Sequence, residues 1–209
     1  MARDPQPGRS EMDIPYVHQA GGDDCYQACL AMVLKHFFPK EEFPRAELNR
    51  LTHHRPGYWT LEAQLLLPLL ERKLKVELHA STPYSELTPE LAEKRYGKRG
   101  AQKLDFQALA WSRQFLKPGL FFQHEIEWKE LVEKFRQGWA TIFCVNEDVL
   151  VKQNLGRFIG HGLVLTGASD SQARVHDPAR SAGMLYPLDH LAAAFASPGT
   201  DHAGLLVKR

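Results

Sequence analysis

The chain contains four residues whose types and spacing fit acyl transfer through a thiol, beginning with Cys25. Cys25 lies in the first turn of an expected helix, where the helix dipole stabilises a thiolate. Gln19 lies six residues upstream, across Gly21-Gly22, so its side-chain amide and the Cys25 backbone N–H would together form an oxyanion hole. Carboxylates at Asp23 and Asp24 would disfavour the thiolate unless they cap the helix or pair elsewhere. The pattern therefore predicts a nucleophilic cysteine that needs a nearby imidazolium.

His161 is the candidate for that imidazole, acting first as general base and then as general acid. The flanking Gly160 and Gly162 would let a substrate backbone approach its ring. Asp177, at the end of the following strand, is the candidate for orienting the imidazole. If the hairpin closes through residues 168–170, then 161 faces 177 and both side chains share one face, whereas a two-residue turn without a bulge would separate them. The triad thus depends on the hairpin register.

The remaining cysteines and histidines favour packing over chemistry. Cys29 lies one turn after Cys25, and Cys144 stands inside an apolar stretch, so both are expected in the core. A zinc site on Cys25, Cys29 and His161 is a weak alternative, because no second CxxC or HxxxH cluster accompanies them. His176 is an alternative base, but its side chain should point to the face of the strand opposite that of Asp177. We expect no metal and no cofactor.

The first half of the chain predicts mainly helices. A buried helix is expected from Asp24 to Phe38, followed by helices near residues 47–54 and 61–73 and a strand at 74–79. Residues 80–103 are polar and predict a surface loop with at most one helical turn, and nothing recognisable follows up to residue 118. The five lysines and arginines of residues 80–103 could form a nucleic-acid-binding patch. Because no aromatic residues are interleaved with them, a solvated surface is the simpler interpretation.

The second half predicts mainly strands, which together with the first half gives an α+β order. Strands are expected at residues 119–123, 140–145, 160–167, 172–177 and 203–208, and helices at 127–137 and 188–195. Residues 1–13 are polar and predict a flexible N-terminal arm, and residues 14–209 contain no linker or repeat. We therefore expect one domain over residues 14–209.

Composition excludes several functional classes. The chain has 209 residues, 44% of them hydrophobic and 24% charged, which is typical of a globular protein. Its net charge of +1 at pH 7 gives no strong field toward nucleic acid or anionic lipid. No apolar run approaches the roughly 20 residues that span a bilayer, so no membrane partner is expected. Three irregularly spaced cysteines suit a reducing compartment, and we expect a cytoplasmic protein.

The order of these motifs resembles a known family. Residues 14–19 (IPYVHQ), Asp24-Cys25 and the helix ACLAMVL are similar to the start of the double-glycine-leader (bacteriocin-processing) peptidase-like branch of the papain-like cysteine peptidase superfamily. The His and Asp-Pro strands and the closing helix and strand are similar as well. The resemblance implies a papain-like fold, with an N-terminal helical part packed on a C-terminal antiparallel sheet. The family usually has a small residue, often glycine, after the nucleophile, whereas this chain has Tyr26.

The resemblance assigns the same roles as the residues themselves: Cys25 as nucleophile, His161 as base, Asp177 as orienting residue and Gln19 as oxyanion donor. The leading hypothesis is a cysteine-dependent amide or peptide hydrolase that acts through a thioester acyl-enzyme on a peptide or protein substrate. A transamidase or deamidase would use the same triad. A non-catalytic peptide-binding papain-like module is a further alternative, in which Tyr26 or a misplaced Asp177 prevents turnover. Oligomeric state has no signature in the sequence.

Overall fold

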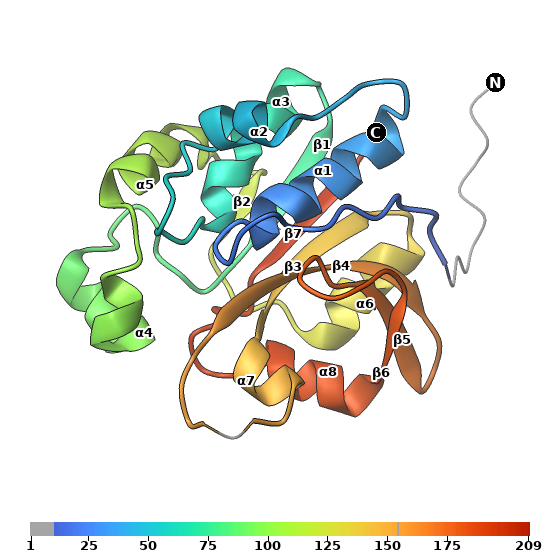
Figure 1. Cartoon of the computed structure of the whole chain (residues 1–209). Coiled ribbons are helices and arrows are strands. Elements are labelled where there is room, and N and C mark those ends of the chain that lie inside the picture. Colours follow the sequence, from blue (N-terminus) through green and yellow to red (C-terminus); the bar gives the residue numbers. More distant parts are fainter. Residues whose placement is uncertain (1–10, 154) are drawn as a thin grey trace.

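The computed structural model describes residues 11–153 and 155–209, which form a single sheet covered by helices on both faces (Figure 1). The strands are β1 (Lys75–His79), β2 (Phe121–Phe122), β3 (Ala140–Asn146), β4 (Gly160–Ala168), β5 (Gln172–His176), β6 (Met184–Pro187) and β7 (Gly204–Lys208). The α-helices are α1 (Cys25–Phe37), α2 (Arg45–Leu51), α3 (Leu66–Glu71), α4 (Pro89–Ala101), α5 (Phe106–Ser112), α6 (Trp128–Arg136), α7 (Glu147–Leu150) and α8 (Leu188–Phe195). Short 3-10 helices lie at Glu62–Leu65 and Arg113–Phe115.

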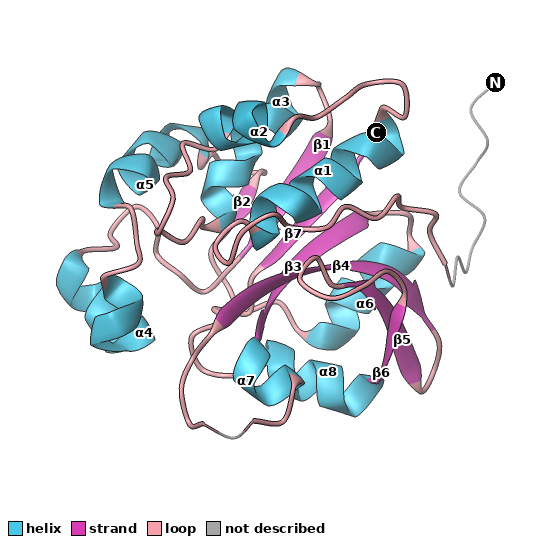
Figure 2. Cartoon of the chain, viewed as in Figure 1, coloured by secondary structure: helices cyan, strands magenta, loops and turns pink. Residues whose placement is uncertain are grey.

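The sheet has seven strands in the order β2-β1-β7-β3-β4-β5-β6, and every neighbouring pair is antiparallel except β1 with the short edge strand β2. The chain is therefore α+β, as the sequence predicts. One detail differs, because β1 comes from the mainly helical first half and, with the short strand β2, extends the sheet beyond β7. The predicted packing of an N-terminal helical part on this sheet is seen in α1, which lies against β4 (Figure 2).

Helix α1 is buried because its sequence is apolar on almost every side. Residues 26–34 of the helix are all buried, and Leu30, Val33 and Leu34 have no exposed surface. A helix without a polar face needs cover all round, and here β3, β4, α2 and the 3-10 helix at Glu62–Leu65 provide it. The other face of the sheet is covered by α6 and α8 (Figure 1). This packing holds the first turn of α1, and with it Cys25, rigidly against the sheet.

The expected surface loop at 80–103 is wrong, because most of it forms α4. Thr88 caps this helix by accepting from the backbone N–H of Leu91 at 3.3 Å, and Pro89 occupies its first turn. The helix is kinked at Gly97, whose φ of 72° favours glycine. Arg95, one of the cationic residues of the supposed patch, turns inward and pairs with Asp201 at 2.6 Å. The segment therefore packs into the fold.

Other elements also differ from the sequence-based expectation. α5, α7 and β6 were not predicted, and the single helix expected over residues 61–73 is a 3-10 helix followed by α3. Residues 1–10 of the expected arm lie outside the described residues. Order begins before residue 14, because Met12 is buried and its N–H donates to the carbonyl of Thr166 at 2.8 Å. No helix among the described residues is both long and apolar enough to cross a membrane.

The centre of the sheet predicts a clear difference between two leucine substitutions. Leu205 of β7 is fully buried between β1 and β3, whereas the side chain of Leu185 in the edge strand β6 is 53% exposed. We expect Leu205→Ala to lower the free energy of unfolding by about 2–5 kcal/mol, since it removes buried methyl groups and leaves a cavity. The control Leu185→Ala should change it by less than about 0.5 kcal/mol. Urea denaturation of both variants measures the difference, and equal losses would contradict this description of the core.

Candidate active site

Cys25 is the first residue of α1, is partly exposed, and opens into a cavity of about 310 Å³. Gln19 and His161 line the same cavity, so three of the four predicted site residues surround one space. Four aromatic residues also line it, namely Tyr26, Trp59, Tyr96 and Phe158. The lining includes four carboxylic acids as well, Asp23, Glu62, Glu147 and Asp201, and no lysine or arginine is among the described lining residues. The size and lining are those of a small-ligand or side-chain pocket.

The carboxylates beside Cys25 pair elsewhere and do not cap the helix with their side chains. Asp24 is buried, accepts a hydrogen bond from the backbone N–H of Gly21 at 2.8 Å, and forms an ion pair with Arg45 at 2.8 Å. Asp23 accepts a backbone N–H from a distant loop. Of the two alternatives that the sequence left open, capping or pairing elsewhere, the structure has the second. The Arg45 guanidinium offsets the Asp24 charge, which reduces the repulsion that a neighbouring thiolate would experience.

A β-bulge decides whether His161 and Asp177 can meet. Near the hairpin turn Ala168 pairs with Ala173, but beyond the bulge between Leu165 and Gly167 the register shifts by one residue. Of the two arrangements that would bring the side chains to one face, a three-residue turn or a bulge, the structure has the bulge. Without the bulge, the observed register would place His161 and Asp177 on opposite faces, because side chains alternate along a strand. With it, the two side chains lie on the same face.

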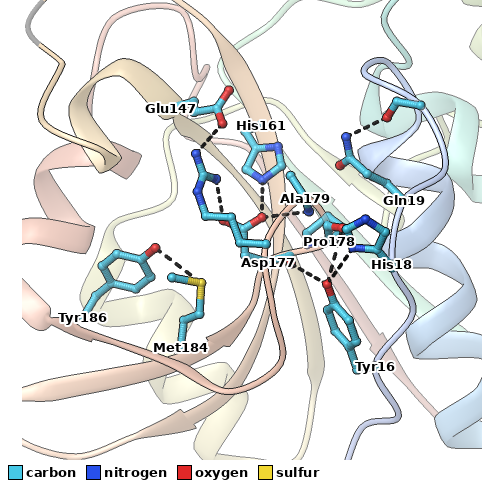
Figure 3. A network of polar contacts seen from close by, with 12 residues as sticks. Tyr16, His18, Gln19, Glu147, His161, Asp177, Pro178, Ala179, Met184 and Tyr186 are labelled. Carbon is cyan, nitrogen blue, oxygen red and sulfur yellow. Dashed lines mark hydrogen bonds and ion pairs between the residues drawn. The ribbon is translucent and has the colours of Figure 1, made fainter.

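The resulting pair is short and buried. Nε2 of His161 lies 2.8 Å from Oδ1 of Asp177 (Figure 3), so Nδ1 is the ring nitrogen left for other contacts. The side chain of Asp177 has no exposed surface. Its other oxygen accepts from Arg180 at 2.7 Å, and Arg180 also binds Glu147 at 2.6 Å. A backbone N–H, that of Ala179, donates to Oδ1 at 2.9 Å.

These contacts shift the pKa values of both partners in opposite directions. Burial alone would lower the pKa of His161, but hydrogen bonds to Asp177 and Cys25 and the charges of both groups raise it from 6.5 to about 10. Burial alone would raise the pKa of Asp177, yet the hydrogen bond and charge of His161, with those of Arg180, hold it below the usual value. The pair is therefore an imidazolium and a carboxylate at neutral pH.

Gln19 is held by two hydrogen bonds, one of them to the residue that follows Asp177. Its Nε2 donates to the carbonyl of Gly21 at 2.7 Å, and its backbone N–H donates to the carbonyl of Pro178 at 2.9 Å (Figure 3). Its Oε1 is buried without a hydrogen-bond partner in the described part of the chain. An amide nitrogen carries two hydrogens, so Nε2 keeps one N–H that is not used by Gly21.

His176, the alternative base, is occupied by backbone groups. Its Nε2 lies 2.7 Å from the carbonyl of Ile14, and its Nδ1 accepts the N–H of Gly183 at 2.9 Å. Both ring nitrogens therefore tie the N-terminal segment to the β5–β6 turn. The structure brings His161, and not His176, to the cavity of Cys25.

The side chain of Tyr26 points into the fold and lines the cavity. Its side chain is 6% exposed, and its hydroxyl donates to the buried carboxylate of Glu62, which also accepts from Tyr84 at 2.6 Å. Burial raises the pKa of Glu62, although both tyrosine hydrogen bonds lower it. The Tyr26 ring packs against β4, where a Cβ at Gly162 would lie only 2.8 Å from it. Gly162 therefore makes room for Tyr26, and the approach of a substrate backbone at this position stays a prediction.

Comparisons with known proteins place this architecture. No model of a known protein family matches the chain, and no curated protein does. Solved structures do match it, and the following three do so over nearly the full length of both chains. The peptidase domain of Streptococcus ComA, a bifunctional ABC transporter of a quorum-sensing pathway, is 13% identical with a TM-score of 0.56, covering 94% of this chain and 98% of that domain. A double-glycine motif protease of an AMS/PCAT transporter, in complex with its leader peptide, is 16% identical, with a TM-score of 0.53 and 97% coverage of both chains.

The third structure is described as a C39-like peptidase from Bacillus anthracis, 11% identical, with a TM-score of 0.58 and 97% coverage of both chains. The chain has the double-glycine peptidase fold. This fold is the papain-like arrangement that the sequence resemblance implies. At such low identity the likeness establishes the fold of the chain, so the chemistry must be argued from its own residues.

Several residues of this double-glycine peptidase fold are not evident from sequence. Arg180 follows Asp177 by three residues, and that spacing is the only local signal for their ion pair. Glu62 is charged in sequence but buried in the structure, because two tyrosines from distant segments satisfy it. Cys144 was expected only in the core, yet it also lines the cavity. These assignments needed the tertiary structure.

The ion-paired state of His161 predicts its titration. By NMR, the imidazole of His161 should stay protonated through neutral pH and titrate near pH 10, far above an ordinary histidine at about 6.5. Cys25→Ser removes the thiolate and Asp177→Asn removes the carboxylate charge, so each should lower the pKa of His161. A His161 pKa that is unchanged in both variants would contradict the described contacts.

Proposed function

We propose that the chain is a cysteine-dependent amide or peptide hydrolase. The observation that carries this proposal is the position of His161, whose Nε2 is held 2.8 Å from the buried carboxylate of Asp177 while its ring lines the cavity of Cys25. The electrostatic effect of Cys25 on the pKa of His161 supports the same arrangement. This is the order nucleophile, base and orienting group that acyl transfer requires.

The acylation step follows from this arrangement. The Cys25 thiolate attacks the substrate carbonyl carbon, a C–S bond forms, and the carbonyl π electrons move onto oxygen. The backbone N–H of Cys25 and the free N–H of Gln19 stabilise that oxyanion. The imidazolium of His161 then gives its proton to the leaving amine nitrogen, the C–N bond breaks, and a thioester remains on Cys25.

Deacylation uses the same residues in reverse order. Neutral His161 takes a proton from water, the resulting hydroxide attacks the thioester carbon, and collapse of the intermediate releases a carboxylic acid and the Cys25 thiolate. Asp177 keeps the imidazole oriented and stabilises its charged form in both steps. No cofactor is required by this sequence of steps.

A peptide or protein is the proposed substrate, and a reducing compartment such as the cytoplasm is the proposed location. The leader peptide bound to a protease of the same fold supports the first proposal. The second is supported by the three cysteines, all of which are free thiols. A thiol nucleophile must remain reduced to act.

The nucleophile is tested by Cys25→Ala. Turnover is measured on the peptide that the wild-type protein cleaves fastest in a synthetic library, and labelling is measured with a fluorescent iodoacetamide. Cys25→Ala should abolish both, because the other two cysteines of the chain are buried. Cys29→Ala and Cys144→Ala are the matched controls and should keep labelling, since burial raises the pKa of both thiols and keeps them unreactive. Undiminished turnover in Cys25→Ala would overturn the proposal.

Gln19→Ala tests the oxyanion role separately from the nucleophile. Loss of one oxyanion donor should reduce kcat by about 10²–10³-fold. Alkylation of Cys25 by iodoacetamide passes through no oxyanion, so its rate should stay near that of the wild type. A parallel fall in both rates would mean that Gln19 only maintains the structure around Cys25.

A further inference from the structure

A second group of histidine and carboxylate side chains lies away from the cavity of Cys25. His79 ends β1, His124 follows β2, and Glu130 lies in the first turn of α6. One potential ligand atom from each lies within 4.8 Å of the others. His79 is 3% exposed, whereas His124 is exposed to solvent. The group therefore combines a fixed, buried ligand with two accessible ones.

The two imidazoles face each other through ring nitrogens. Nδ1 of His79 lies 3.3 Å from Nε2 of His124. Two nitrogens bound to a tetrahedral zinc ion, each about 2.05 Å from the metal, lie about 3.3–3.4 Å apart. The two nitrogens therefore already have the separation that they would have on a shared metal ion.

His79 is oriented by groups on its other side. Its Nε2 faces Oε2 of Glu77 at 3.4 Å, and Lys134 donates to the same oxygen at 2.6 Å. The ring stacks on Phe122 with 4.7 Å between centroids and 11° between planes. With a proton on Nε2 shared with Glu77, Nδ1 carries the lone pair that points at His124. A carboxylate behind a ligating histidine is the usual outer partner of a bound metal.

We propose that His79 Nδ1, His124 Nε2 and a carboxylate oxygen of Glu130 bind one divalent transition-metal ion of the zinc type. Two imidazoles and a carboxylate suit this class of ion, and a water molecule would complete a tetrahedron. Bound there, the ion would fasten the two-residue strand β2 and the start of α6 to β1. The role of the ion is structural, and it is independent of the hydrolase proposal.

The test uses the full chain carrying Cys25→Ala, because the active-site thiol and His161 could also bind zinc. Calorimetric titration with Zn²⁺ should show a single equivalent bound, and Zn²⁺ should raise the Tm, since the ion binds the folded state. His124→Asn and Glu130→Gln change accessible residues that the core does not need, and each should weaken binding at least tenfold. Glu77→Gln should weaken it about 10–100-fold through the orientation of His79.

His53→Asn is the matched control. His53 is an exposed histidine with a φ of 51°, a conformation that asparagine tolerates well, and it stacks on Trp111 far from the group in sequence. This variant should bind Zn²⁺ as tightly as its parent. Zn²⁺ affinity that is unchanged in His124→Asn and Glu130→Gln would overturn the proposal, as would the absence of binding to the parent. Neither result would bear on the role of Cys25.

Discussion

The buried carboxylate of Asp177 is the charge around which the rest of the site is arranged. A carboxylate without solvent loses several kcal/mol of hydration, so it persists only where donors replace the water. His161, Arg180 and a backbone N–H two residues on supply those donors. Together they fix the turn after β5, and the carbonyl of Pro178 in that turn accepts the backbone N–H of Gln19. Because the buried Asp177 carboxylate needs these donors, it positions both the imidazole of His161 and the segment that carries Gln19.

The sequence predicted those parts of the fold that depend on local periodicity. The helix that begins at Cys25 and the strand that carries His161 are strongly apolar, and both were placed within a residue or two of their observed bounds. Whether His161 could reach Asp177 depended on the hairpin register, and the sequence left open whether an odd turn or a bulge would provide it. The bulge that brings both side chains to one face lies at Thr166, whose carbonyl accepts from the N–H of Met12, some 150 residues away in sequence. No local pattern reports such a pairing.

The sequence also did not show which polar residues would be buried. α4 is rich in charged residues and looks solvated in sequence, yet Tyr96 and Arg95 both bind Asp201 from the far end of the chain. Glu62 is buried for the same kind of reason, because Tyr26 and Tyr84 replace its hydration. Each of these groups is stable only when partners from distant segments are already in place. Composition and spacing therefore indicated which candidate residues would lie together more reliably than which side chains would surround them.

The contact between Tyr26 and Gly162 links the identities of two positions that are far apart in the chain. The ring occupies the space that any side chain at 162 would need. A relative with a small residue after its nucleophile would have that space empty, and a larger residue on the strand could fill it. Substitutions could therefore move side-chain volume from position 26 on the helix to position 162 on the strand without moving either backbone. The two positions should therefore vary as a pair among relatives, with at most one of them bulky.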